Sequence, residues 1–392
     1  MDIDMKDKIR FGVIGCGLMA RGSHLPNLLE LDSAEIHTCC DIKEENLAAC
    51  APFSPKKLSR DFREVVNDPE VDALVVATTE AFRVPVVEAA AKAKKPVYTE
   101  KPLADNLENA LAIERLVKES GIPFCVGHNR RCSPALVEAQ EIFASHMRDP
   151  KPYPWRFARE GIEEMHVGDH PGVPVVAIRI NDDWKSWKPV HLESELNRRV
   201  GLVLSEGTHF ADLATWFIDS EPVRVFCSGE GVLNHAIFIK YANGGLATIT
   251  ISATGTFGYP KELLEAMGNA GIVAVDHMLE VRSAGIAGAP LIKLYPMLND
   301  RHPEVGKEGG LHGWLKKKAA ACEEAAREKN PLAQFTAEPD KGHKRMLKEF
   351  VREIRGERGP VSPVASAVTA MRICLAAAKS LTEGREVQIA EI

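Results

Sequence analysis

The sequence predicts an α/β fold in its first third, with a parallel β-sheet covered by helices on both faces. Short apolar runs rich in β-branched residues have the length of buried strands and lie at 10–14, 35–40, 71–77, 96–98 and 123–126. Segments with the apolar spacing of helices lie at 25–31, 84–93, 107–119 and 136–145. Because parallel strands need crossover connections, this alternation predicts a parallel sheet.

A glycine-rich turn follows the first predicted strand directly and opens the first predicted helix. Gly15, Gly17 and Ala20 give this turn the form G-x-G-x-x-A. In this pattern Gly15 permits the tight bend, Gly17 lets the backbone approach a pyrophosphate, and Ala20 lets the helix pack closely on the strand. An ordinary turn is the alternative, but the flanking strand and helix are those that the fingerprint requires. The turn predicts a Rossmann dinucleotide-binding domain, with Leu18 and Met19 beside the cofactor at the helix N-terminus.

Asp41 ends the second predicted strand. A carboxylate at this position accepts hydrogen bonds from the adenosine ribose and repels a 2′-phosphate, which favours NAD over NADP. Two alternatives stay open. Asp41 could cap the helix that begins near Lys43, and Lys43 could itself pair with a 2′-phosphate.

The bulk composition is that of a folded globular protein. With 392 residues, of which 45% are hydrophobic, the chain is long enough for two domains with a core each. The net charge is −6, and Lys and Arg are scattered among Asp and Glu. No basic face is therefore predicted for nucleic acid or anionic lipid, and we expect neither nucleic acid nor a membrane as a partner.

The cysteine pattern predicts a reducing, cytoplasmic setting. The nine cysteines form no C-x-x-C pair, and Cys39 and Cys40 are adjacent, which suits neither a disulfide framework nor a zinc ribbon. The first ten residues are charged, and no later apolar run is expected to span a bilayer. His166 and His170 are spaced like metal ligands on a helix, but nearby Gly and Pro favour a loop, so no metal site is expected.

Four further motifs carry a family resemblance. They are Ala77-Thr78, Glu100-Lys101-Pro102, VGHNRR at 126–131 and GTHFADL at 207–213. With them the chain resembles the glucose-fructose oxidoreductase, inositol dehydrogenase and MocA (Gfo/Idh/MocA) oxidoreductase family, for which the E-K-P tripeptide is the most specific signal. The resemblance extends nearly end to end, and the stretches near 147–174 and 300–339 look like insertions.

The resemblance implies an NAD-binding Rossmann domain over residues 1–130 and a substrate-binding and oligomerisation domain over residues 131–392. The second domain is expected to be α+β, with an open, mostly antiparallel sheet. Strand patterns agree and lie at 173–180, 223–228, 235–241 and 246–253, with Asn243-Gly244-Gly245 as a hairpin turn. Because such sheets often pair between subunits in this family, we expect a homo-dimer or homo-tetramer.

The resemblance also implies cofactor contacts beyond the glycine turn. They are expected at Ala77, Thr78, Glu100, Lys101 and Asn129. Arg83 stands where many relatives carry a histidine, and Thr79 replaces a frequent proline, so the chain departs from the family pattern next to Thr78.

Oxidation of an alcohol needs a base for the hydroxyl proton, and an imidazole with a near-neutral pKa suits this role. His209 matches the family's catalytic histidine, although a buried structural histidine is the alternative. Lys101 follows the fourth predicted strand, so its ammonium is expected in the crevice where α/β sheets bind ligands, stabilising alkoxide charge. The alternative for Lys101 is an ordinary surface lysine.

One catalytic position departs from the family pattern. Many members carry an aspartate four residues before the histidine, where this chain has Ser205. Glu206 could supply the missing carboxylate, or the proton path could run through Ser205 and water. Both alternatives stay open.

Several side chains of types that hold sugars are expected to bind the substrate. They are Arg130, Arg179, Trp184, Trp187, His209 and Asp212. Aromatic rings stack on the C–H faces of sugars, and guanidinium groups bind carboxylates. Together with Trp155, Arg156 and Arg159 of the first insertion, these cations suggest an acidic substituent on the substrate. An oligomer interface or a solvated loop is the alternative for the insertion.

These features predict an NAD-dependent oxidoreductase acting on CH–OH groups, which transfers a hydride between nicotinamide and a sugar, inositol or sugar acid. One alternative is an NAD-dependent oxidoreductive glycoside hydrolase, which oxidises its substrate, eliminates the glycosidic bond and returns the hydride. The other is a catalytically inactive NAD-binding regulator, against which the presence of both Lys101 and His209 argues.

Overall fold

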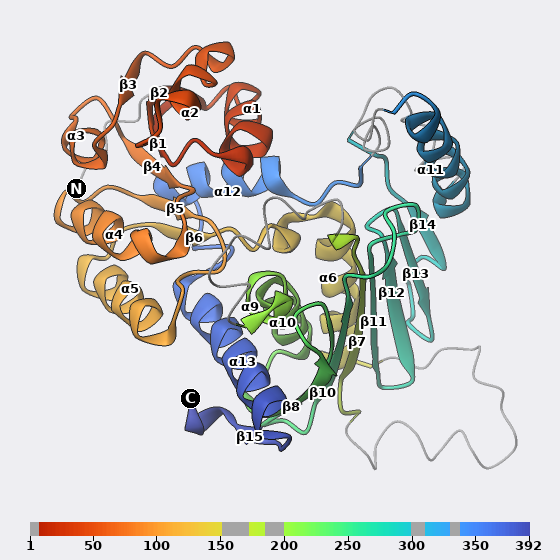
Figure 1. Cartoon of the computed structure of the whole chain (residues 1–392). Helices are drawn as coiled ribbons and strands as arrows, with labels where there is room; N and C mark the ends of the chain where they lie inside the picture. The colour runs from red at the N-terminus through yellow and green to blue at the C-terminus, as the bar shows by residue number, and fades with distance from the viewer. Residues whose placement is uncertain (1–7, 151–171, 185–199, 299–309, 330–337) are drawn as a thin grey trace, which may run out of the picture. The chain divides into compact units, whose positions relative to one another are not determined.

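The computed structural model describes residues 8–150, 172–184, 200–298, 310–329 and 338–392 (Figure 1). The chain forms two compact units. Unit 1 comprises Met1–Cys132 and Gly342–Met371, and unit 2 comprises Ser133–Lys341 and Arg372–Ile392. The predicted domain boundary lay after residue 130. The main difference in the structure is that Gly342–Met371, near the C-terminus, belongs to unit 1.

Unit 1 is built on a parallel sheet with the strand order β3-β2-β1-β4-β5-β6. The strands are β1 (Ile9–Ile14), β2 (Ala34–Cys40), β3 (Lys57–Ser59), β4 (Ala73–Val76), β5 (Val97–Thr99) and β6 (Phe124–Val126). This order is that of a Rossmann fold, so the predicted fold of the first third is confirmed. The short, partly exposed β3 was not among the predicted strands.

The helical segments of unit 1 connect these strands and follow the last of them. They are η1 (Ala20–His24), α1 (Leu25–Leu29), α2 (Glu44–Ala48), η2 (Ala51–Phe53), α3 (Phe62–Asn67), η3 (Glu80–Phe82), α4 (Arg83–Lys92), α5 (Leu107–Ser120), η4 (Asn129–Cys132) and α12 (His343–Ile354). The first predicted helix, at 25–31, therefore ends earlier than expected and is preceded by a π-helical turn.

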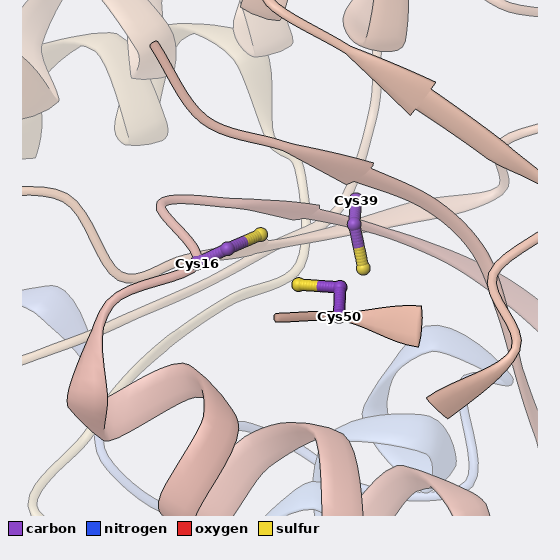
Figure 2. A group of neighbouring side chains, drawn as sticks. All are labelled: Cys16, Cys39 and Cys50. Carbon is purple, nitrogen blue, oxygen red and sulfur yellow. The ribbon is translucent and has the colours of Figure 1, made fainter. Parts of the chain in front are cut away.

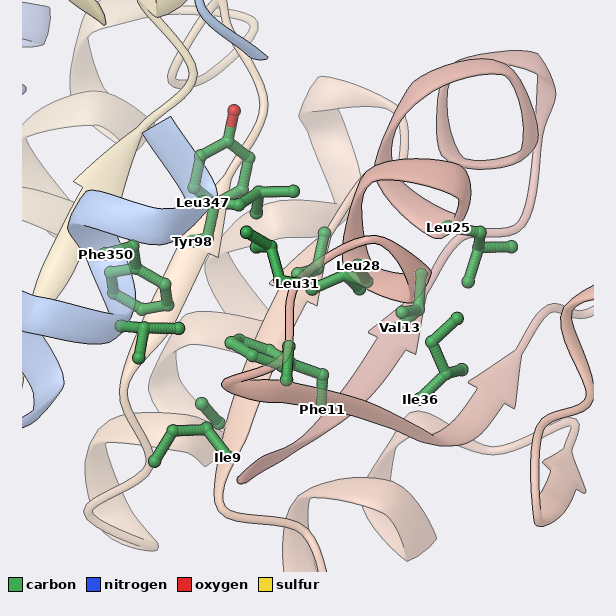
Figure 3. Close-up of a cluster of buried hydrophobic side chains, with 14 of the residues drawn as sticks. Ile9, Phe11, Val13, Leu25, Leu28, Leu31, Ile36, Tyr98, Leu347 and Phe350 are labelled. Carbon is green, nitrogen blue, oxygen red and sulfur yellow. The ribbon is translucent and has the colours of Figure 1, made fainter. Parts of the chain in front are cut away.

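Helix α12 belongs to unit 1 because its apolar face completes the core of that unit. Phe350 is fully buried, and its ring centroid lies 6.4 Å from that of Phe11 on β1 and 6.1 Å from that of Tyr98 on β5. Figure 3 shows Leu347 of the same helix within this cluster of buried side chains. Burying one such side chain stabilises the fold by roughly 1.5–3 kcal/mol.

Unit 2 is built on an open, mostly antiparallel sheet with the order β14-β13-β12-β11-β7-β10-β9-β8-β15. Its strands are β7 (Val175–Asn181), β8 (Pro222–Glu230), β9 (Asn234–Tyr241), β10 (Leu246–Ser252), β11 (Glu262–Gly268), β12 (Gly271–Asp276), β13 (Glu280–Ala284), β14 (Ile292–Leu294) and β15 (Val387–Gln388). Only β7 and β10 pair in parallel among them. The predicted sheet type is confirmed, and the predicted turn at 243–245 joins β9 to β10 with Gly244 at a φ of +88°.

The helices of unit 2 are α6 (Pro134–Arg148), α9 (Leu202–Ser205), α10 (Gly207–Ile218) and α11 (Gly310–Arg327), with the 3-10 turn η8 (Ile389–Glu391) near the C-terminus. Phe210 and Leu213 of α10 line a small pocket together with Ile178 of β7 and Leu264 of β11. Helix α10 therefore covers the face of the sheet to which Ile178 points. This places the GTHFADL motif directly on the sheet.

Helix α13 (Val364–Glu383) begins in unit 1 and ends in unit 2. Its 20 residues have a mean hydropathy of 1.4 in the best window, so by length and composition it could span a membrane. The expectation that no apolar run reaches this length is therefore wrong for this segment. However, 56% of that window is buried within the fold, including Ala370, Met371 and Ile373. Burial as a core helix accounts for its apolar composition.

Candidate functional site

The glycine turn between β1 and η1 is the first element of the candidate site. Gly15 has a φ of +90°, and a Cβ atom there would lie 2.7 Å from the carbonyl group of Ala77 and 2.8 Å from the Thr78 nitrogen. Glycine is therefore required by both the backbone conformation and the contact with the end of β4. At Gly17 a Cβ atom would meet no atom of the described residues within 4 Å. These residues thus leave the space above Gly17 open.

Asp41 ties the glycine turn to the end of β2. Its Oδ2 atom accepts hydrogen bonds from the Cys16 nitrogen at 2.8 Å and from Asn46 Nδ2 at 3.0 Å. Its Oδ1 atom accepts one from the Lys43 nitrogen at 2.9 Å. The N-cap of α2 is Lys43, so Asp41 is not the cap of this helix, although its carboxylate bonds the Lys43 nitrogen. The contact of Asp41 with the adenosine ribose stays a prediction.

Arg83, which stands where many relatives carry a histidine, has a structural role at the end of the sheet. Its guanidinium is buried and donates hydrogen bonds to three backbone oxygens, those of Glu100 at 2.5 Å, Thr78 at 3.0 Å and Pro102. These carbonyls lie on the segments that follow β4 and β5. Arg83 therefore joins two loops at the carboxyl edge of the sheet, where α/β folds bind their ligands.

Glu100 and His24 form a buried pair in the same region. Glu100 Oε1 lies 2.8 Å from His24 Nε2, and Glu100 Oε2 accepts a hydrogen bond from the Lys101 nitrogen at 3.2 Å. Burial alone would raise the pKa of Glu100, but the hydrogen bond from His24 and the charges of His24, Lys101 and Arg83 lower this pKa to about 2. Glu100 is therefore an ionised side chain that holds the backbone of Lys101.

Asn129 and Arg130 lie on η4, which follows β6. Both side chains are buried, and Arg130 Nη1 donates a hydrogen bond to Asn129 Oδ1 at 3.2 Å. The cofactor residue and the substrate residue predicted here thus contact each other directly.

In unit 2 the predicted catalytic residues lie around the junction of α9 and α10. Ser205, Glu206, His209 and Asp212 are all buried. The backbone nitrogen of His209 donates to the carbonyl oxygen of Glu206 at 3.2 Å. Glu206 is the N-cap of α10, three positions before His209, so the two residues are neighbours at the start of this helix.

A buried ion-pair set surrounds the Glu206 carboxylate. Lys261 Nζ lies 2.7 Å from Asp182 Oδ2 and 3.6 Å from Glu206 Oε2, and the Lys261 side chain is only 9% exposed. The Lys261 nitrogen also donates to His277 Nδ1 at 3.1 Å. Two carboxylates and one ammonium give this set a negative formal charge.

Sequence reasoning did not identify Asp182 or Lys261. Ile178 and Ile180 are buried on β7, and Asp182, two residues further on, continues this alternation. A polar residue at a position expected to be buried was therefore the signal that could have identified Asp182. Lys261 precedes β11, a strand that was not predicted, and no motif surrounds it. Only the pairing of β7 with β11 brings these two side chains together.

The other predicted substrate residues are more dispersed. Arg179 alternates with the buried Ile178 and Ile180, so it lies on the opposite face of β7 from α10. Its guanidinium donates to the Pro260 oxygen at 3.1 Å and lies 5.4 Å from the centroid of the Tyr259 ring. The structure does not bring Arg179 together with His209. Trp184 follows β7, whereas Trp187 and the residues 155, 156 and 159 lie outside the described residues.

Two groups of potential metal ligands occur in the described ranges. His37, Asp68 and Glu70 form one, but Lys57 Nζ already pairs with Asp68 at 2.9 Å and Glu70 at 3.1 Å. The other is a buried group of three thiols, Cys16, Cys39 and Cys50, shown in Figure 2. His166 and His170 lie outside the described residues.

Comparison with known proteins agrees with this geometry. A family model described as an oxidoreductase family with an NAD-binding Rossmann fold, GFO_IDH_MocA, matches residues 9–128. The myo-inositol 2-dehydrogenase of Thermotoga maritima is 23% identical over 98% of this chain and 99% of its own length. Residues 9–128 therefore belong to the Gfo/Idh/MocA oxidoreductase family, and the whole chain is similar to one of its dehydrogenases. The resemblance inferred from the E-K-P and GTHFADL motifs is thereby confirmed, and the chain is an NAD(P)-dependent oxidoreductase.

Solved structures of Gfo/Idh/MocA type share the fold of the whole chain. A probable dehydrogenase from Thermotoga maritima has a TM-score of 0.70 at 23% identity, covering 98% of this chain and 100% of its own. A scyllo-inositol dehydrogenase from Lactobacillus casei, solved with NAD(H) and scyllo-inositol, has a TM-score of 0.68 at 16% identity and covers 98% and 99%. At these identities the likeness concerns the fold.

Proposed function

We propose that this Gfo/Idh/MocA oxidoreductase uses NAD to transfer a hydride between nicotinamide and a hydroxyl-bearing carbon of an inositol, a sugar or a sugar acid. The observation that carries the proposal is the buried Glu206 carboxylate, paired with Lys261 and placed one helical turn before His209. It supplies the acidic group that Ser205 does not. The full-length similarity to a myo-inositol 2-dehydrogenase supports the substrate class.

Three features of unit 1 fit a dinucleotide. The space above Gly17 is open, the apolar side chains Leu18 and Met19 are 64% and 39% exposed, and Thr78 Oγ1 is buried without a hydrogen-bond partner in the described part of the chain. Asp41 would accept hydrogen bonds from the adenosine ribose. We expect Ala77, Thr78 and Asn129 to contact the nicotinamide side.

When bound, NAD supplies the hydride acceptor or donor. The residues of the chain then have to position the substrate hydroxyl and move its proton. In this proposal His209 takes the proton, Glu206 stabilises the resulting imidazolium, and Lys261 with Asp182 holds Glu206 in place. Lys101 donates a hydrogen bond to the reacting oxygen, and the Glu100–His24 pair holds its backbone.

A homo-oligomer is also part of the proposal. Phe226 of β8 lies opposite Phe238 of β9, with ring centroids 6.4 Å apart, and both are exposed, as is Leu246 of β10. An exposed apolar stripe on a sheet is typical of an interface. All nine cysteines are free, which supports a reducing compartment such as the cytoplasm.

The test is to measure NADH formation with panels of inositols, sugars, sugar acids and glycosides, with NAD and NADP in parallel. The proposal expects NADH to accumulate with at least one polyol and NAD to be preferred. Release of an aglycone without NADH would support the glycosidase alternative instead. Tight NAD binding with no turnover on any class would support the inactive regulator. His209→Ala is expected to abolish turnover while NAD affinity is kept, and Lys101→Met is expected to lose turnover more than NAD affinity.

A further inference from the structure

Three thiols meet in the core of unit 1, next to the glycine turn. The sulfur atoms of Cys16, Cys39 and Cys50 all lie within 4.8 Å of one another, and all three side chains are fully buried. Figure 2 shows that they point toward one another from different elements. Cys16 is the residue between the two glycines, Cys39 lies on β2, and Cys50 immediately precedes η2.

We propose that Cys16, Cys39 and Cys50 form a binding site for a trivalent thiophilic metalloid, of which arsenous acid is the simplest form. Three converging thiols in an otherwise apolar core match the three-coordinate, soft character of such an element.

Charge favours a trivalent element over the usual metals. Three thiolates with one divalent ion would leave a negative charge in a core with no exposed surface, and zinc would also need a fourth ligand. The carboxylate of Asp41, which bonds the backbone of Cys16, already accepts three hydrogen bonds, from the nitrogen of Cys16, the nitrogen of Lys43 and Asn46 Nδ2. A tris-thiolate of a trivalent element is neutral.

The binding step is balanced without a redox partner. Arsenous acid, As(OH)₃, reacts with three thiols so that three As–O bonds break and three As–S bonds form. Each thiol proton leaves with one hydroxide as water, and arsenic stays trivalent. The thiols are held in the protonated form that this step needs, because Cys16 Sγ donates to the Cys40 oxygen at 3.5 Å and Cys50 Sγ to the Asn46 oxygen at 3.3 Å.

The position of Cys50 provides an entry route. It lies between the short helix α2 and η2, and the neighbouring residues Ala48, Ala51 and Pro52 are exposed or partly exposed. Local opening of this segment would expose the three sulfur atoms without disrupting the strands of the sheet.

Occupancy of this site should affect the cofactor turn, a consequence that rests on the proposed function. The Cys16 nitrogen donates to Asp41, and its neighbour Gly15 is packed against Ala77. Bonding of the three sulfur atoms to one arsenic atom would move Cys16. Its neighbour Gly15 and its hydrogen-bond partner Asp41, both of which are predicted to contact NAD, would move with it. Binding of the metalloid and of NAD should therefore oppose each other, each weakening the other by about tenfold.

The experiment uses the full chain, reduced with a phosphine and incubated with sodium arsenite. Intact-mass measurement should show one arsenic atom gained and three hydrogen atoms lost per chain, and X-ray absorption should show three sulfur neighbours. Cys39→Ser and Cys50→Ala should lose the adduct completely. Cys125→Ser removes a buried thiol of the same core that is not in the group, so it should keep the adduct.

The proposal is overturned if no adduct forms, if arsenic has only two sulfur neighbours, or if the Cys50→Ala protein still binds it. Thermal unfolding of each variant shows whether the fold is kept, and Cys50→Ser is a second variant should Cys50→Ala not fold. NAD affinity is measured separately with and without arsenite. Failure of the unloaded protein to bind NAD would count against the proposed function and leave the mass result intact.

Discussion

His24 Nε2 lies 2.8 Å from Glu100 Oε1. This buried pair connects η1, which follows the glycine turn, with the residue before Lys101. Neither residue is at the surface, and the carboxylate also holds the Lys101 nitrogen. The two segments are far apart in the sequence. This pair therefore links the position of Lys101, the predicted hydrogen-bond donor to the reacting oxygen, to η1, which follows the glycine turn of the cofactor site.

Glu100→Gln should destabilise the protein by about 1–3 kcal/mol, because it removes the charge from a buried, hydrogen-bonded pair while keeping its shape. Urea unfolding measures this change. Glu88→Gln is the matched control, since Glu88 pairs with Lys92 at the surface, and it should leave stability unchanged. Equal effects of the two substitutions would contradict a special role for the buried pair.

Glu353→Gln should stabilise the protein at pH 8 and have little effect at pH 4. Burial raises the pKa of Glu353 to about 7, although its bond from the Phe124 nitrogen at 2.9 Å acts against this rise. The unfolded chain loses this proton near pH 4.5, so wild-type stability falls as pH rises from there through about 7. Glutamine keeps the acceptor for Phe124 without an ionisable group. If the free energies of unfolding of the wild type and the Glu353→Gln protein had the same dependence on pH, a raised pKa of Glu353 in the folded protein would be ruled out.

His277→Asn should reduce the loss of stability on acidification. Burial, with a smaller effect of the Lys341 charge, lowers the pKa of His277 to about 3. Since the unfolded imidazole titrates near pH 6.5, stability is present above that value and is lost as pH falls toward 3, by about 1.4 kcal/mol for each unit. Asparagine can still accept the hydrogen bond from the Lys261 nitrogen. Unfolding midpoints between pH 7 and 5 should therefore fall less steeply in the variant.

Asp41→Asn should weaken NAD binding and raise the relative affinity for NADP by about tenfold, because the repulsion of a 2′-phosphate is removed. Asparagine keeps an oxygen for the Cys16 nitrogen, so the turn should keep its conformation. Fluorescence titration with both cofactors gives the ratio. An unchanged ratio with weaker binding of both would show that Asp41 acts only through the turn.

Glu206→Gln should lower kcat by about a hundredfold or more and shift its pH profile, as expected for a group that supports proton transfer. Ser205→Ala is the control at the neighbouring position and should change kcat little. Steady-state rates from pH 6 to pH 9 distinguish the two paths left open by the sequence. A large loss in Ser205→Ala with a normal Glu206→Gln protein would assign the proton path to Ser205 and water.

The Rossmann unit, its glycine turn and the E-K-P segment could be predicted from the amino-acid sequence, because these features depend on local patterns. Short apolar strands, φ-positive Gly15 and the carboxylate that ends β2 can each be identified from a few consecutive residues. The family resemblance added His209 and Glu206 by position alone.

The contacts between residues far apart in the sequence became visible only in the folded chain. The insertion of α12 into the core of unit 1, the Lys261–Asp182 pair and the three-thiol group each join residues from separate elements, and no local pattern marks their partners. The strands from β11 to β14 were likewise missed, since their burial depends on neighbours across the sheet. Contacts between distant segments arise from packing and pairing register, which a single sequence does not display.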